Sequence, residues 1–210
     1  MTFAIFLLLF SCQKTNLKRH REELINKYIG GVMNNKKIGI DVVDRRFKFL
    51  DTFALRVPGT YNHSIQLASF KKLDRGHFRY YNAELTDLNY SKVSRILLPR
   101  ERYVVDIFRM MTRVRSEECL KFLEKNRAIL IGAQGISLAW QESGNMFLFS
   151  GRKVSFDQAH ALWVDPIGHH RVPFIDCCLG GGWRFSLGRF EDVWSEGDCL
   201  LCFRKRENKF

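Results

Sequence analysis

The residues of this chain with the chemistry for a metal site are six cysteines and a pair of adjacent histidines. Cys199 and Cys202 are separated by two residues, a spacing found in one half of many zinc sites. The candidates for the other half are Cys177, Cys178, His169 and His170. The two residues between Cys199 and Cys202 are leucines, without a turn former, which favours a strand with buried thiols. The uneven spacing of the cysteines favours reduced thiols, as in the cytosol. We therefore expect no metal and no cofactor.

The second constellation with acid–base chemistry is His169-His170, which lies between Asp165 and Asp176 in the sequence. The competing interpretation is a pair of loop histidines between two strands, and we favour it. There is no Ser-His-Asp order, Walker loop, GxGxxG, HExxH or EF-hand loop in the sequence. The glycines at 180–182 do not open a helix and are not expected to bind phosphate. The sequence therefore carries none of the common enzyme signatures.

Positive charge is in excess in this chain. The 210 residues include 34 Lys and Arg against 22 Asp and Glu, which gives a net charge of +12. This balance attracts nucleic acid, anionic lipid or an acidic protein partner. Between Lys71 and Tyr81 basic and aromatic residues are interleaved, which permits RNA binding through phosphate pairing and base stacking. The alternative for this stretch is an ordinary solvated basic face.

The N-terminus begins with an apolar run from Phe3 to Phe10, which is too short to span a bilayer and has no basic residue before it. The run ends in Leu-Phe-Ser-Cys, which is similar to a bacterial lipobox with Cys12 as the lipidated residue. The alternative, which we favour, is a buried first strand or a peripheral membrane contact followed by the basic stretch 14–21. Residues 15–28 have the apolar spacing of a short surface helix.

The middle of the chain, "RILLPRERYVVDIF" at 95–108, has a proline just before an apolar pattern. Proline is tolerated in the first turn of a helix, so we expect Pro99 to open one. The apolar positions that follow step by three and four, as on one helix face, and are Val104, Ile107, Phe108, Met111 and Val114. Ser116, with Glu117 and Glu118 after it, predicts the N-terminus of a second helix that ends near Asn126.

The rest of the chain predicts strands. Residues 38–57 are expected to form two strands, or a strand and a short helix, ended by Pro58-Gly59. Beyond Arg127, short apolar runs alternate with turn formers, as in an antiparallel sheet. They are AILIGAQGISLAW, NMFLFSG, ALWV, RVPFIDCCL, WRFSLGRF and CLLCFRK. The predicted fold class is α+β, with a helical pair at about 99–126 packed on a C-terminal antiparallel sheet at about 127–206. The segments 1–95, 96–126 and 127–210 are expected to form one compact domain.

Several segments, taken in order, resemble the ORF-zero (P-zero) silencing suppressors of poleroviruses, which are plant viruses. These segments are DRRFKFLDTFALRV at 44–57, YNHS at 61–64, ILLPRERY at 96–103, AILIGAQGISLAW at 128–140 and HHRVPFID at 169–176. The resemblance rests on their shared order and similar separation. It implies a non-enzymatic virulence factor in the host cell cytoplasm, either dissolved there or associated with a membrane.

In the family that the chain resembles, an F-box-like motif recruits the Skp-type adaptor of an SCF ubiquitin ligase, which drives the degradation of ARGONAUTE. The motif is Leu-Pro, two residues, Leu or Ile, and a proline ten to thirteen residues later. Leu98 and Pro99 fill its first two positions, whereas residue 102 is Arg and no proline lies between 103 and 165. The resemblance implies a docking site formed by Leu97, Leu98, Pro99, Tyr103 and Ile107. The same residues are alternatively ordinary core and capping residues.

Gly182-Trp183 resembles the glycine-tryptophan dipeptide by which some proteins dock on ARGONAUTE, and its alternative is a strand tryptophan that faces inward. The leading hypothesis is therefore a viral suppressor of RNA silencing. The alternatives are a lipid-anchored bacterial envelope protein that uses Cys12 and a basic protein that sequesters small RNA.

Overall fold

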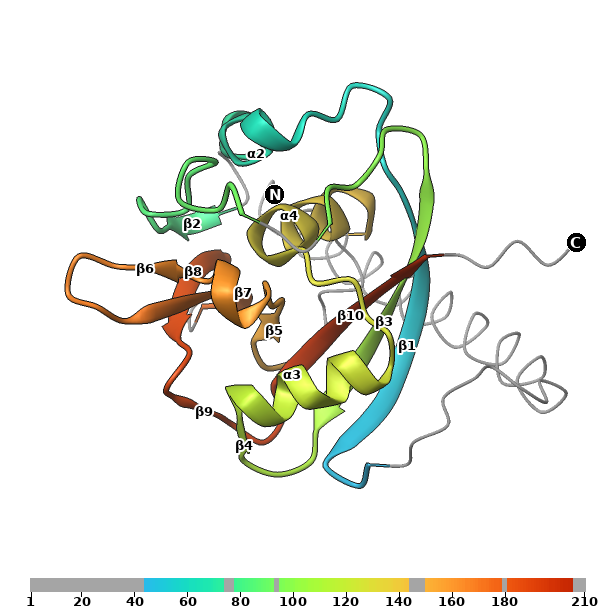
Figure 1. Cartoon of the computed structure of the whole chain (residues 1–210), viewed down its shortest axis with the longest axis vertical. Helices are drawn as coiled ribbons and strands as arrows, with labels where there is room; N and C mark the ends of the chain where they lie inside the picture. Colours follow the sequence, from blue (N-terminus) through green and yellow to red (C-terminus); the bar gives the residue numbers. More distant parts are fainter. Residues whose placement is uncertain (1–43, 74–77, 93–94, 144–149, 179–180, 206–210) are drawn as a thin grey trace, which may run out of the picture. The chain divides into compact units, whose positions relative to one another are not determined.

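The structure is a computed structural model that describes residues 44–73, 78–92, 95–143, 150–178 and 181–205 (Figure 1). Several predictions lie outside these residues. They concern the apolar run 3–10, the lipobox-like Cys12, the basic stretch 14–21, the helix at 15–28, the strand content of 38–43 and most of the NMFLFSG run.

The centre of the described chain is a sheet of eight strands, in the order β1-β3-β10-β5-β7-β8-β2, with the short β6 paired to β7. Most neighbours are antiparallel, and the pairs β10–β5 and β2–β8 are parallel. A separate two-stranded ladder joins β4 (Val114–Arg115) to β9 (Val193–Trp194). The eight strands are β1 Phe47–Arg56, β2 Phe78–Tyr81, β3 Arg102–Met110, β5 Lys153–Val154, β6 Trp163–Val164, β7 His170–Cys177, β8 Trp183–Arg189 and β10 Cys199–Lys205.

Helices cover the sheet on both faces. Helix α4 (Gly132–Ser143) shares its core with the β3 side chains that include Ile107. Helix α3 (Ser116–Lys125) packs through Phe122, whose ring lies 4.9 Å from that of Phe108. Consecutive strand residues point to opposite faces, so α3 and α4 lie on opposite sides of β3. The remaining helices are α2 (Gln66–Leu73), which packs on α4, and the 3₁₀ turns η1 (His63–Ile65) and η3 (Ala159–Ala161).

The α+β class is confirmed, but the sheet is larger than the predicted one. It includes β1 and β2 from the N-terminal half, outside the expected range of 127–206. Within the predicted range, β7, β8 and β10 match the runs RVPFIDCCL, WRFSLGRF and CLLCFRK. The stretch 47–56 forms one strand, β1, and Pro58-Gly59 follow it in a turn.

The prediction that Pro99 opens a helix is wrong, because residues 102–110 form strand β3. This strand lies between β1 and β10 and is covered on both faces, so most of its side chains are buried. A strand that is buried on both faces is apolar almost without interruption, and such a run contains helical spacing by accident. The predicted helical pair is therefore a strand followed by one helix.

That second helix is confirmed as α3, with Glu117 and Glu118 in its first turn. Its N-terminus differs in detail from the prediction. Arg115 is the capping residue, and its amide N–H donates to the Glu118 carboxylate at 2.9 Å. Ser116 is already helical and buried, and its hydroxyl accepts a hydrogen bond from the Trp194 indole at 2.9 Å.

The prediction of strand structure in AILIGAQGISLAW is also wrong, because residues 132–143 form helix α4. All residues from Ile131 to Trp140 are buried. A helix that is buried all round has no polar face and therefore lacks the amphipathic pattern by which helices are recognised. The two glycines that suggested strand breaks have packing roles. Gly132 has φ +52°, and a Cβ on Gly135 would lie 2.8 Å from the Cβ of Ile131.

Candidate partner-binding site

The Leu-Pro step lies in a tight turn immediately before β3. The carbonyl of Leu98 accepts a hydrogen bond from the amide of Glu101 at 3.2 Å, and Arg100 between them has φ +67°. Proline at the second position and a positive φ at the third are the features of a type II turn. Pro99 therefore acts as the corner of a turn, for which its fixed φ is suited, and not as the first residue of a helix.

This turn is fastened to the end of β1. The amide of Arg100 donates to the carbonyl of Val57 at 3.0 Å, and the amide of Val57 donates to the carbonyl of Glu101 at 3.0 Å. The third position of a type II turn is usually glycine or asparagine, so an arginine there costs about 1 kcal/mol or more of backbone strain. The surrounding hydrogen bonds hold the turn in this conformation.

A polar contact beneath the turn adds to its rigidity. The buried Tyr103 hydroxyl donates to the Glu101 carboxylate at 2.6 Å and accepts from the amide of Leu98 at 3.4 Å. Burial, and then the bond to Glu101, raise the pKa of Tyr103. The hydrogen bond from Tyr103 holds the pKa of Glu101 below its usual value, with smaller help from Lys205. Tyr103 thus supports the turn from inside and is not itself available to a partner.

The residues of the predicted docking site divide into a buried and an exposed group. Leu97, Tyr103 and Ile107 are at most 1% exposed and belong to the core. Leu98 is 50% exposed, and Pro99 is exposed as well. Ile96, which the motif did not include, is 55% exposed. The surface available to a partner is therefore Ile96, Leu98 and Pro99, which we call the Leu-Pro tip.

A pocket of about 410 Å³ adjoins the same segment through Arg95, the residue before Ile96. It is lined by aliphatic side chains together with the polar residues Arg95, Glu124, Gln158 and His160. The full lining is Arg95, Leu120, Glu124, Ala128, Ile129, Leu130, Gln158, Ala159 and His160. The sequence gave no signal for this pocket, because three separate segments form it.

Gly182 and Trp183 lie at the start of β8, where the β7–β8 hairpin begins its second strand. Gly182 is exposed with φ +81°, and Trp183 is half-buried. The Trp183 ring lies 4.7 Å from the Trp140 ring, and the Lys153 ammonium lies 5.6 Å from its centre. Since β8 is the fourth neighbour of β3 in the sheet, about 19 Å separates the two strands. The structure therefore does not bring Trp183 together with the Leu-Pro tip.

The cysteine and histidine constellation does not assemble into a metal site. Cys199 and Cys202 are buried in β10, three positions apart, so their thiols point to opposite faces of the strand. His169 and His170 lie at the β6–β7 turn, where His170 contacts Glu191 at 3.0 Å. Within the described ranges, no three His, Cys, Asp or Glu side chains are grouped so that they could hold a metal ion.

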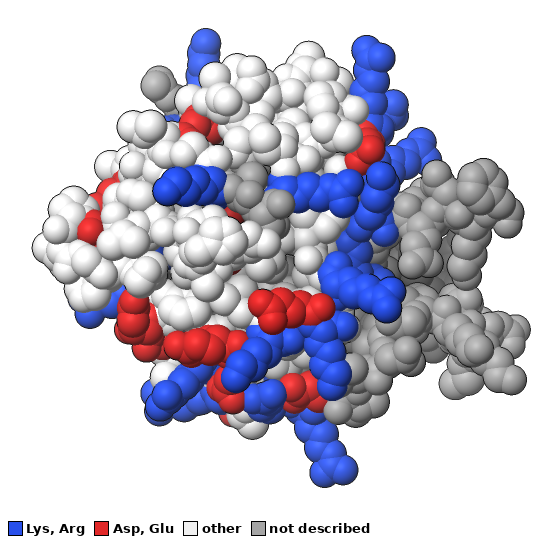
Figure 2. Space-filling model, viewed as in Figure 1, with Lys and Arg blue, Asp and Glu red and all other residues white. Residues whose placement is uncertain are grey.

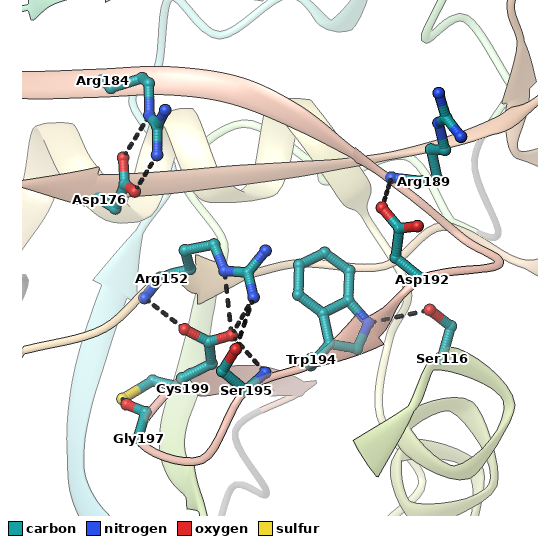
Figure 3. Close-up of polar contacts among 11 residues, drawn as sticks. Ser116, Arg152, Asp176, Arg184, Arg189, Asp192, Trp194, Ser195, Gly197 and Cys199 are labelled. Atoms are coloured by element: carbon teal, nitrogen blue, oxygen red, sulfur yellow. Dashed lines mark hydrogen bonds and ion pairs between the residues drawn. The ribbon is translucent and has the colours of Figure 1, made fainter. Parts of the chain in front are cut away.

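The densest polar network joins Arg152 to the turn between β9 and β10 (Figure 3). The Asp198 carboxylate accepts from the Arg152 backbone and guanidinium at 2.6–3.0 Å and from the Ser195 amide at 2.9 Å. The guanidinium also lies 4.9 Å from the centre of the Trp194 ring, which packs over Gly188. These groups satisfy one another's hydrogen-bonding capacity, so we interpret the network as a structural clamp.

One buried carboxyl group has no such partners. Asp157 is 0% exposed, and neither of its oxygens has a hydrogen-bond partner among the described residues. It lies against the first residue of α4, since a Cβ on Gly132 would be 1.8 Å from its Oδ2. Burial raises the pKa of Asp157 well above the usual value. The sequence gave no signal for this buried, unpartnered carboxyl group.

Comparisons with known proteins gave no match to a family model, to a curated protein or to a solved structure. Among the residues that the structure describes, no helix combines the length and the apolar character that crossing a bilayer requires.

Proposed function

We propose that this chain is a non-enzymatic adaptor that suppresses RNA silencing in the cytoplasm of a host cell. In this proposal the Leu-Pro tip binds the Skp-type adaptor of an SCF ubiquitin ligase, and ARGONAUTE is brought to the ligase and degraded. Gly182 and Trp183 are the proposed contact for ARGONAUTE. The observation that carries the proposal is the exposure of two aliphatic side chains, Ile96 and Leu98, on a turn that hydrogen bonds hold in place.

The form of the tip supports a docking role over a packing role. Leu97, between the two exposed residues, is fully buried and anchors the segment in the core. Ile96 and Leu98 are thereby held at the surface, and the tip loses little conformational entropy when it binds a partner. A strained Arg100 at the corner is a further feature that functional segments often have.

The binding mode differs from a helix laid in a groove. The apolar positions of 102–110 are strand residues that the sheet and the helices cover, so they cannot enter a partner's groove. Within the segment 95–110, the tip offers the exposed apolar side chains Ile96 and Leu98, and the pocket that Arg95 lines lies beside it. A small, rigid contact of this kind depends on a few residues at its centre.

Replacing Leu98 and Pro99 together by alanine is expected to weaken binding of a purified Skp-type adaptor by at least about 30-fold, because hot-spot residues each contribute about 2 kcal/mol or more. Suppression of a silenced reporter in leaves should fall in parallel, and ARGONAUTE should persist. Both residues are exposed, so the protein should still accumulate.

The matched control is Leu88→Ala, which removes an 84% exposed leucine elsewhere on the surface and should change nothing. Leu97→Ala is not a suitable test, because this residue belongs to the core and its loss reduces stability. Full suppression by the Leu98→Ala, Pro99→Ala protein, at equal protein level, would remove the tip from the mechanism.

A second candidate function is binding of single-stranded RNA at the edge strand β2. Tyr80 is 49% exposed there, its neighbour Arg79 is exposed, and its partner in β8 is Arg184. Lys71 and Lys72 in α2 are also exposed. An exposed aromatic ring among cationic side chains is the combination by which proteins stack bases and pair phosphates.

For this second function, Tyr80→Ala is expected to weaken RNA binding by about 1–3 kcal/mol, the usual contribution of one stacked base. Gel shifts with a labelled single-stranded oligonucleotide at several salt concentrations measure this, and the affinity should fall as salt rises. Ile65→Ala provides a control on another exposed side chain. If no shift appears even at low salt, RNA binding is excluded and the adaptor function stands alone.

A further inference from the structure

Two arginines near the Leu-Pro tip face each other across neighbouring strands, which lowers the stability of the sheet. Arg56, at the end of β1, is the direct cross-strand partner of Arg102, at the start of β3, and both are exposed. Like charges in directly opposite positions destabilise a sheet. Neither guanidinium has an ion pair with an acidic residue among those described. Two arginines therefore face each other without a counterion from the described chain.

Arg100 adds a third cation at the same end of the sheet. Its side chain crosses Gly59, where a Cβ would lie 3.3 Å from the Arg100 Nε. The one acid in this turn, Glu101, is engaged by the Tyr103 hydroxyl and lies 3.6 Å from the Lys205 ammonium. Figure 2 shows Lys and Arg side chains gathering on the side of the molecule where β1 and β10 end and β3 begins. The tip is thus an aliphatic patch at the end of the sheet that also carries these three arginines, which we call its cationic rim.

We infer that this surface binds an acidic segment of a protein partner that carries aliphatic side chains: the aliphatic groups contact Ile96, Leu98 and Pro99, and the carboxylates pair with Arg56, Arg100 and Arg102. The inference rests on the proposed docking role of the tip and names the chemistry of its partner. Charge complementarity across an interface steers association and selects the partner.

A protein segment fits this surface better than nucleic acid or membrane does. The exposed residues of the tip are aliphatic and proline, while the nearest ring, that of Tyr103, is fully buried. Base stacking requires an exposed ring, which the tip does not offer. Membrane contacts are typically anchored by Trp, Tyr or Phe at the interface, and these are also absent from the tip. Carboxylates, in contrast, pair with arginine in a planar, bidentate manner.

The test is Arg56→Glu, which replaces the facing cations by an opposite-charge pair across the two strands. The probe is a synthetic amphipathic peptide of glutamate and leucine, measured against the full chain by fluorescence anisotropy at several salt concentrations. We expect about tenfold weaker binding and a flatter salt dependence, since one rim charge is reversed. The melting temperature should stay level or rise, because the like-charge contact is relieved. If Arg56→Glu binds the peptide more weakly and its melting temperature stays level or rises, Arg56 contributes to binding and not to the stability of the fold.

The matched control is Arg113→Glu, which makes the same change of charge at an exposed position beyond the other end of β3 and should bind the peptide as the wild type does. A peptide with serine in place of leucine should bind at least about tenfold more weakly, and so should the Leu98→Ser protein. Equal binding by Arg56→Glu and Arg113→Glu would overturn the inference. So would a result in which a single-stranded RNA or phosphatidylserine vesicles bind in an Arg56-dependent way and the peptide does not.

The Skp-type adaptor, used as a second probe, separates this inference from the proposed function. If the peptide binds with the expected dependence on Arg56 and the adaptor does not bind at all, the acidic partner stands and the ligase function fails. If the adaptor binds the wild type and Arg56→Glu equally well, the ligase function stands and the inference is overturned.

Discussion

Replacing Gly132 by alanine is expected to lower the free energy of unfolding by about 4 kcal/mol or more, a large part of the stability of an ordinary domain. The added Cβ would lie 1.8 Å from Asp157 Oδ2 and 2.3 Å from Cγ, which no side chain tolerates. Asp157 is fully buried, so its carboxyl has nowhere to move. The φ of +52° adds the usual cost of a left-handed conformation, about 1–2 kcal/mol. Urea denaturation followed by circular dichroism measures the loss.

The control that measures the cost of the positive φ alone, without a steric clash, is Gly168→Ala. Gly168 also has a positive φ, +89°, but a Cβ there meets no atom within 4 Å. Its substitution should therefore cost only the conformational part, about 1–2 kcal/mol. Combining Gly132→Ala with Asp157→Ala should recover part of the loss, because the second change removes the carboxyl from the new Cβ. If Gly132→Ala were no more harmful than Gly168→Ala, the close contact between α4 and Asp157 would be disproved.

Replacing Asp157 by asparagine is expected to make the protein more stable at neutral and alkaline pH, and to change little in acid. Burial raises the pKa of Asp157 in the folded protein, whereas in the unfolded chain it is about 3.9. The folded state thus keeps a proton that the unfolded state releases. The stability associated with this proton is complete below about pH 4 and is lost as the pH rises toward the folded-state pKa. Asparagine keeps the shape of the side chain and does not ionise.

The measurement is the midpoint of urea denaturation of both proteins from acid to alkaline pH. The difference between the two curves isolates Asp157, because other buried groups such as Lys153 are common to both. Asp165→Asn is the control of opposite sign. Burial acts to raise the pKa of Asp165, but the amide of His169 and the guanidinium of Arg171 outweigh it and lower the pKa. This control should lose stability above about pH 4. Parallel curves for the wild type and Asp157→Asn would show that Asp157 is charged in the fold.

A helix or strand of this fold could be predicted from the sequence when one of its faces is exposed to solvent. Helix α3 could be predicted because the exposed residues Glu117, Lys121 and Lys125 alternate with buried residues, which gives an amphipathic pattern. Strands β7, β8 and β10 were readable because turn formers separate them. Strand β3 and helix α4 are covered on every side, and burial of this kind removes the period that distinguishes a strand from a helix. Asp106 interrupts the apolar sequence of β3, and the Arg204 guanidinium and the Thr52 hydroxyl donate to its buried carboxylate.

The candidate site shows the same limit. Pro99 indicated a local change of structure, and Leu98 was named from the resemblance. Which leucine faces solvent is decided by contacts with Val57 and Tyr103, which are distant in the sequence or belong to another element. The facing pair Arg56 and Arg102 exists only through the register of β1 and β3. No local pattern contains that register.

The position of β10 between β3 and β5 has a consequence for synthesis. Until residues 199–205 have left the ribosome, β3 and β5 each have an unpaired edge. Without β10, no strand joins β1 and β3 to the rest of the sheet. Unpaired edges of this kind invite association with other chains. A growing chain must therefore be kept apart from its neighbours until β10 has been made, and a stop codon before residue 199 should give an aggregate instead of a smaller working protein.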